Sequence, residues 1–231
     1  MADTLEEQAR SLTGIGEVRL NEGNHNNAIQ AFQEAHLRTL ALYERDPSNG
    51  QRLFDLSQAQ FWIGFSAMQQ GKLEDALVWM KKYRDSAVKL AAMDRNNFDW
   101  QREAAYGYHN MAVMDHRLGR YASAEQAMLA EKALYEQWLP LHPKDYDLRF
   151  EAANVDSILG SLALLQGRLK DAENYFNAQA QAIQYNLEAD SGNAKWKEVR
   201  MDAYLLLVDV VSMQGRRAEA NRLAAEALLL A

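Results

Sequence analysis

Apolar and small residues recur along this chain with one fixed spacing. In each copy of the pattern a bulky apolar residue directly precedes a smaller one, and these pairs are Ile15-Gly16, Ile63-Gly64, Met111-Ala112, Leu159-Gly160 and Leu207-Val208. Seven positions further on stands a glycine, at Gly23, Gly71, Gly119, Gly167 and Gly215. The distance from each of these glycines to the next is 48 residues. A pattern repeated at such a period predicts an array of similar helical units.

The third copy illustrates which elements the pattern predicts. Residues 100–118 and 121–139 have the spacing of apolar positions that is typical of helices, and Gly119 lies between them. Asn97 or Asp99 is placed to accept hydrogen bonds from the free amides at the start of the first helix. Gly119 permits the left-handed backbone conformation that commonly ends a helix. We therefore predict an all-α protein built from helical pairs.

The repeat runs through the sequence without a linker, which predicts a single repeat domain over residues 1–231. Its expected units are residues 3–48, 49–96, 97–144, 145–192 and 193–231. A pair of antiparallel helices in such an array buries its apolar side only by stacking on its neighbours, so about five pairs predict an α-solenoid.

The two ends of the sequence suggest that it belongs to something larger. A helical pattern is already present at Leu5, and the chain finishes in an apolar run at residues 224–231 with no polar capping helix. Because solenoids usually have polar caps, we expect a segment of a longer protein. The apolar end at Leu228, Leu229 and Leu230 is also a possible homodimer surface.

Composition and charge exclude several classes of function. The formal net charge is −7, and the basic residues form no stripe, which argues against nucleic acid as a partner. No stretch approaches the roughly 20 apolar residues of a membrane span, so we expect no direct membrane insertion by this segment. The sequence contains no cysteine. It therefore has no disulfide, and it fits the cytoplasm or the periplasm equally, so its localisation stays open.

The repeated residues resemble the tetratricopeptide repeat. The small residue, an alanine twelve positions later and, in four copies, an aromatic residue or methionine four positions beyond that form the resemblance; the last group is Phe32, Met80, Met128 and Phe176. A further alanine of the family occurs only as Ala35 and Ala227, whereas Tyr83, Glu131 and Gln179 replace it elsewhere. The resemblance implies a right-handed superhelix. The family unit has about 34 residues, so this longer unit requires longer helices.

The contexts of Trp100 and Trp196 are similar to those in long-unit tetratricopeptide arrays of bacterial multidomain signalling proteins, such as serine/threonine kinases and regulatory ATPases. In those proteins the arrays serve as sensory or partner-binding portions. The resemblance also implies that the first helices line a concave groove. Its partner-facing positions are then Thr13, Glu17, Gln58, Phe61, Phe65, Tyr106, His109, Val113, Asn154, Ser157 and Ser161, and Arg10 occupies in the first copy the place of Gln58.

Phe61, Phe65 and Tyr106, with His109 near them, would form an aromatic floor with a few polar groups that suits an extended peptide or a partner helix. The alternative is that these aromatic side chains simply pack against adjacent units. Sequence alone leaves both interpretations open.

No pattern of catalytic or metal-binding residues stands out. His109 and His116 could share a helix face, but a zinc site needs three or four ligands, so we expect no metal and no cofactor. Acidic residues recur near the starts of the first helices, where they favour the helix dipole, at Glu7, Asp55, Glu103 and Glu151. Asp156 is an outlier, because it occupies a core-like position where an unpaired carboxylate is expensive to bury; we expect it either to face a cavity or to lie on a helix that is rotated outward. We expect no enzyme activity.

Two functions follow from these patterns. The first is a non-catalytic protein-protein interaction module whose concave groove binds a protein or peptide segment, as the regulatory or sensory part of a bacterial signalling protein. The alternative is a ligand- or stress-sensing extracytoplasmic domain of a membrane-tethered serine/threonine kinase. Both depend on a recognition surface, and neither depends on a reaction.

Overall fold

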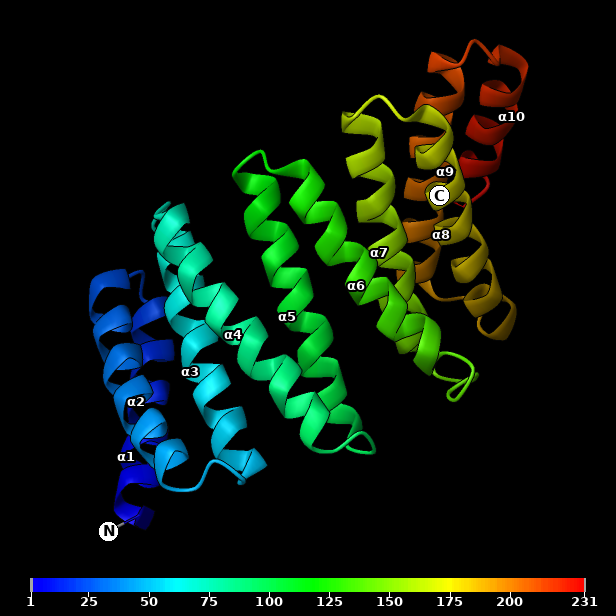
Figure 1. Cartoon of the computed structure of the whole chain (residues 1–231). Coiled ribbons are helices and arrows are strands. Elements are labelled where there is room, and N and C mark those ends of the chain that lie inside the picture. Colours follow the sequence, from blue (N-terminus) through cyan, green and yellow to red (C-terminus); the bar gives the residue numbers. More distant parts are fainter. Residues whose placement is uncertain (1, 231) are drawn as a thin grey trace. The chain divides into compact units, whose positions relative to one another are not determined.

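The computed structural model describes residues 2–230, so the outermost positions of the predicted domain, 1 and 231, lie outside the described residues. Within that range the chain forms helices and no strands (Figure 1). The helices are α1 (Ala2–Asn21), α2 (His25–Arg45), α3 (Gly50–Gln69), α4 (Leu73–Met93), α5 (Phe98–Arg117), α6 (Tyr121–Trp138), α7 (Tyr146–Leu165), α8 (Leu169–Ala189), α9 (Ala194–Met213) and α10 (Arg217–Leu228). The all-α prediction is confirmed.

The chain divides into two compact units, Met1–Ala127 and Met128–Ala231, with the boundary inside α6. In the first unit each helix from α1 to α5 packs against the next one along the chain. In the second unit α7 packs on α8, α8 on α9 and α9 on α10. The predicted arrangement of consecutive packed helices is therefore confirmed, while a single continuous domain stays a prediction.

The repeated glycines end the first helix of every pair. Their φ angles are 74° at Gly23, 72° at Gly71, 71° at Gly119, 73° at Gly167 and 80° at Gly215, all in the left-handed region. In the third copy α5 and α6 occupy Phe98–Arg117 and Tyr121–Trp138, within two residues of the predicted ranges. The backbone needs of this turn thus explain why glycine recurs there.

Side-chain caps start the first helices of the last four pairs. Asn97 Oδ1 accepts a hydrogen bond from the amide of Trp100 at 3.2 Å, so the cap is Asn97 and not Asp99. Asn49 and Asn193 make the equivalent bond at 3.2 Å, and Asp145 makes it at 2.8 Å. Each cap satisfies an amide that the helix itself leaves without a partner.

Close packing within a pair accounts for the small residues. A Cβ atom added to Gly16 would lie 2.4 Å from Cε1 of Phe32, and one added to Gly160 would lie 2.5 Å from Cε1 of Phe176. At Gly64 the corresponding neighbour is Met80, whose Sδ would be 3.2 Å away. In each case a large side chain of the second helix therefore fills the space beside the small residue of the first helix.

Across residues 2–230, no helix combines the length and the apolar character that crossing a membrane requires.

Candidate functional site

The eleven predicted groove positions lie on first helices of the pairs. Thr13 and Glu17 are on α1, and α7 carries the three positions of the second compact unit; the complete set is Thr13, Glu17, Gln58, Phe61, Phe65, Tyr106, His109, Val113, Asn154, Ser157 and Ser161. Every one of these side chains is partly buried. Each of them is therefore in contact with its own helices and still has some area exposed to solvent.

The aromatic floor of Phe61, Phe65 and Tyr106 belongs partly to the packing of the first unit. The rings of Phe61 and Phe65 stack with centroids 5.8 Å apart, and Phe61 also lies 5.4 Å from the ring of Tyr83 on α4. All three floor residues pack against a buried cluster that includes Met80, Tyr83 and Met114. The two interpretations of these aromatic residues therefore overlap, since the same rings pack on neighbouring helices and keep an exposed part.

A hydrogen-bonded carboxylate joins three helices beside this floor. Glu103 on α5 accepts a hydrogen bond from the Tyr83 hydroxyl at 2.8 Å and from Gln58 Nε2 at 2.9 Å. Burial raises the pKa of the Glu103 carboxyl, and the two hydrogen bonds oppose that shift without cancelling it. The sequence assigned Glu103 to the dipole of its own helix, whereas its actual partners come from α3 and α4.

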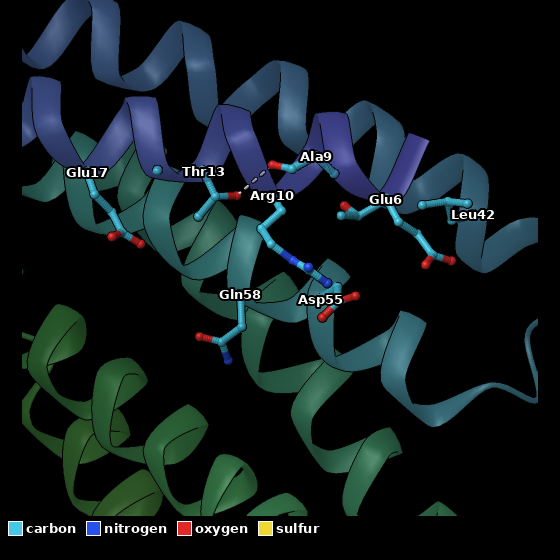
Figure 2. A pocket seen from close by; sticks show the side chains of 10 residues that line it. Glu6, Ala9, Arg10, Thr13, Glu17, Leu42, Asp55 and Gln58 are labelled. Atoms are coloured by element: carbon cyan, nitrogen blue, oxygen red, sulfur yellow. Dashed lines mark hydrogen bonds between the residues drawn. The ribbon is translucent and has the colours of Figure 1, made fainter. Parts of the chain in front are cut away.

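A pocket of about 320 Å³ opens among α1, α2 and α3 (Figure 2). Its lining includes three of the predicted groove residues, Thr13, Glu17 and Gln58, together with Glu6, Arg10 and Asp55. Figure 2 shows the Arg10 side chain extending from α1 toward Asp55 on α3. The Thr13 hydroxyl donates to the carbonyl oxygen of Ala9 at 3.1 Å. Three of the predicted groove residues thus line one pocket, which the sequence gave no sign of, and their role in binding a partner stays a prediction.

Asp55 is the half-buried acid of this pocket. It accepts a hydrogen bond from Gln51 Nε2 at 2.9 Å, on its own helix. Burial raises the pKa of the Asp55 carboxyl; the hydrogen bond from Gln51 and the charge of Arg10 lower it, and Glu6 raises it further. Glu6 itself lies 3.6 Å from Arg52. The cost of burying the charged Asp55 carboxylate therefore exceeds the stabilisation that Gln51 and Arg10 give it.

In the second unit, Asp156 and Glu151 accept hydrogen bonds from side chains of α6. Asp156 is only 7% exposed and accepts a hydrogen bond from Lys132 Nζ at 2.6 Å. Asp156 is therefore buried and paired with a lysine, a partner that the sequence analysis did not name. Glu151 accepts a hydrogen bond from the Tyr135 hydroxyl at 3.2 Å, while the Ser161 hydroxyl donates to the carbonyl of Ser157 at 2.9 Å. The remaining groove residue on α7, Asn154, is partly buried.

Among the described residues, no group of three or more histidine, cysteine, aspartate or glutamate side chains is arranged to hold a metal ion. His116 instead packs against the ring of Tyr121, with centroids 5.6 Å apart. At the C-terminal end Leu228 and Leu229 are 77% and 87% exposed. A homodimer through that end stays a prediction.

Neither a protein-family model nor a curated protein matches this sequence. Solved structures do match its fold. BtubC (BKLC) from P. vanneervenii has a TM-score of 0.69 at 15% identity, over 99% of this chain and 89% of that one. TPR-like repeats of a kinesin light chain from Podosopora anserina have a TM-score of 0.64 at 13% identity, over 96% and 93% of the two chains.

A third similar structure is the Rap conjugation gene regulator of plasmid pLS20 in complex with its Phr peptide. It has a TM-score of 0.52 at 15% identity, and the match covers 95% of this chain and 52% of the regulator. These levels of identity establish the fold and nothing further. The protein has the fold of the tetratricopeptide-like helical repeats, as the resemblance of its repeated residues implied.

Proposed function

We propose that this protein is a non-catalytic interaction module that binds a protein or peptide segment along its first helices, as the regulatory or sensory part of a bacterial signalling protein. The observation that carries the proposal is the partial burial of the aromatic floor. Phe61, Phe65 and Tyr106 are held by a buried cluster on one side and retain exposed area on the other. Aromatic side chains are enriched at protein interfaces, and tyrosine is among the residues that most often contribute much of the binding energy.

The pocket beside Gln58 supports the same function. Gln58 lines the pocket and stands one turn before the floor residue Phe61 on α3, so a partner on the floor would lie next to a polar group of the pocket. Peptide sites commonly combine apolar contact area with a few fixed polar groups. The Rap regulator, whose fold is similar, was solved with a peptide bound, which adds support by analogy of fold.

The experiment that tests this function selects binding peptides from a random displayed library on the immobilised chain. Each selected peptide is then measured against a double variant, Phe65→Ala with Tyr106→Ala. Because both residues also pack on the buried cluster, a matched control is needed for lost stability. Leu77→Ala serves, since Leu77 packs on the same cluster from the second-helix side, on α4.

We expect the double variant to bind the selected peptides at least about tenfold more weakly, because anchoring aromatic side chains commonly contribute 2 kcal/mol or more. The Leu77→Ala control should bind like the wild type at a temperature where both are folded by circular dichroism. A library that yields no specific peptide, or peptides that bind the double variant equally well, would contradict the proposed function.

A further inference from the structure

Two repeat-equivalent positions differ in how their carboxylate is satisfied, and the difference lies at the pocket. Asp55 and Glu103 are 48 residues apart and occupy the same place in α3 and α5. Glu103 receives hydrogen bonds from Tyr83 and Gln58. The residues that stand 48 positions before those two donors are Ala35 and Arg10. An alanine has no hydroxyl to offer, so the donor that Tyr83 supplies has no counterpart beside Asp55.

Asp55, which lacks this donor, borders open space. The pocket of about 320 Å³ is lined by Asp55 on α3, by Arg10 and Glu17 on α1, and by Thr39 and Leu42 on α2. In the part of the chain that the structure describes, Asp55 accepts a hydrogen bond from Gln51 alone. A carboxylate oxygen has about two acceptor sites. Asp55 can therefore take a donor that enters the pocket from outside.

The charges around the pocket select the kind of donor. Three carboxylates line it, those of Glu6, Glu17 and Asp55, against the single guanidinium of Arg10. Arg52 offsets part of the charge of Glu6 from 3.6 Å. Glu17 takes part in none of the ion pairs formed among the described residues. The balance that remains is negative, and charge complementarity favours a cation that can also donate hydrogen bonds.

We propose that this pocket receives a basic side chain, arginine or lysine, of the peptide bound on the aromatic floor, with Asp55 as its acceptor. The inference rests on the proposed function, because it names the partner chemistry of the same surface. Gln58 lines the pocket and precedes the floor residue Phe61 by one turn of α3. A peptide with a basic residue next to an apolar one therefore matches the order of the two sites.

The test uses the full chain and short probes whose ends are blocked. Acetyl-Gly-Gly-Arg-Gly-Gly-amide is titrated by ¹H–¹⁵N NMR to about 10 mM, a concentration that detects millimolar dissociation constants. The matched probes carry citrulline, which has the shape of arginine without its charge, or glutamate in place of the arginine. We expect the arginine probe to shift amide signals of α1 and α3 and to bind about tenfold more tightly than the citrulline probe.

Two substitutions must act in opposite directions. Asp55→Asn keeps the shape of the side chain and removes its charge, and we expect it to weaken binding of the arginine probe about tenfold. Arg10→Gln introduces the residue found at position 58, removes a competing cation, and should tighten binding several-fold. Glu74→Gln is the matched control, because Glu74 is an exposed carboxylate on α4 that does not line the pocket; its affinity should equal that of the wild type.

Three results would overturn the inference. The first is equal binding of the arginine and citrulline probes. The second is the absence of any amide shift with the arginine probe at 10 mM, which is about ten times a millimolar dissociation constant. The third is tighter binding of the glutamate probe that is lost in Arg10→Gln. Any of these leaves the proposed function intact if library-selected peptides still require Phe65 and Tyr106. Conversely, arginine-probe binding that depends on Asp55, without any dependence of selected peptides on the floor, supports the pocket and contradicts the proposed function.

Discussion

The junction between α1 and α3 and the junction between α3 and α5 are built from the same repeat and yet treat their acid differently. At the second junction Glu103 lies among donors from two other helices, Tyr83 and Gln58. At the first, Asp55 accepts its hydrogen bond from Gln51 within its own helix and faces a pocket. The comparison shows that equivalent positions of one repeat surround their acid with different side chains, since Tyr83 and Gln58 at the second junction correspond to Ala35 and Arg10 at the first.

The largest expected effect concerns a third acid, Asp156, whose partner is the charged side chain of Lys132. Lys132→Met would leave Asp156 buried without its cation, and we expect the free energy of unfolding to fall by about 2 kcal/mol. This is less than for a fully buried pair, since the Lys132 side chain is 27% exposed. Urea unfolding at neutral pH measures it. Adding Asp156→Leu should recover most of the loss; if the double variant is as unstable as the single one, the unpaired charge is not the cause.

Removing the donor that distinguishes the two junctions should have the next largest effect. Tyr83→Phe deletes one of the two inter-helix hydrogen bonds to Glu103, and we expect a loss of about 1 to 2 kcal/mol in chemical denaturation. Tyr43→Phe is the matched control, since the Tyr43 hydroxyl accepts from the exposed Lys89 and should matter little. Equal losses in both variants would mean that the Glu103 bond is not special.

The pH dependence of stability sharpens the comparison through Glu103. Its pKa in the folded protein is raised above the ordinary 4.5, mainly by burial, so the folded chain binds more protons than the unfolded one just above that pH. The contribution of Glu103 to the unfolding free energy therefore decreases as pH rises through that window. Glu103→Gln lacks this titration, so the unfolding free energy of the wild type minus that of the variant should fall as pH rises, measured by urea unfolding from about pH 4 to 8. A difference that is flat across the range would refute the assignment.

The smallest expected effect is on Asp55 itself. Arg10→Gln makes the first junction more like the second and removes a charge that lowers the pKa of Asp55. We expect that pKa to rise, with a change in stability of only about 0.2 to 1 kcal/mol, because the Arg10 side chain is exposed. A carboxyl ¹³C titration of Asp55 in both proteins measures the shift. An unchanged or lowered pKa would show that Arg10 does not act on Asp55.

Much of the fold was predictable because it depends on neighbours along the chain. The turn at Gly119 needs a left-handed residue, and the cap at Asn97 needs a short polar side chain three positions before an amide. Gly16 and Phe32 lie on adjacent helices joined by a short turn, so their complementary sizes are also visible in the sequence. The candidate groove was predictable only as far as the face of each first helix, which follows from periodicity.

The sequence by itself determined the helices, their turns and caps, the pairing of small with large residues and the face on which Gln58 and Phe61 lie. The tertiary structure decided which donors reach each acid and where a pocket remains. Tyr83 and Glu103 are 20 positions apart, and the 2.8 Å bond between them depends on how closely α4 and α5 pack. Asp55 likewise accepts its hydrogen bond from its own helix, because in the described residues neither α1 nor α2 donates one to it. Backbone geometry is set within a few residues, whereas the satisfaction of a buried charge is set by whichever helices surround it.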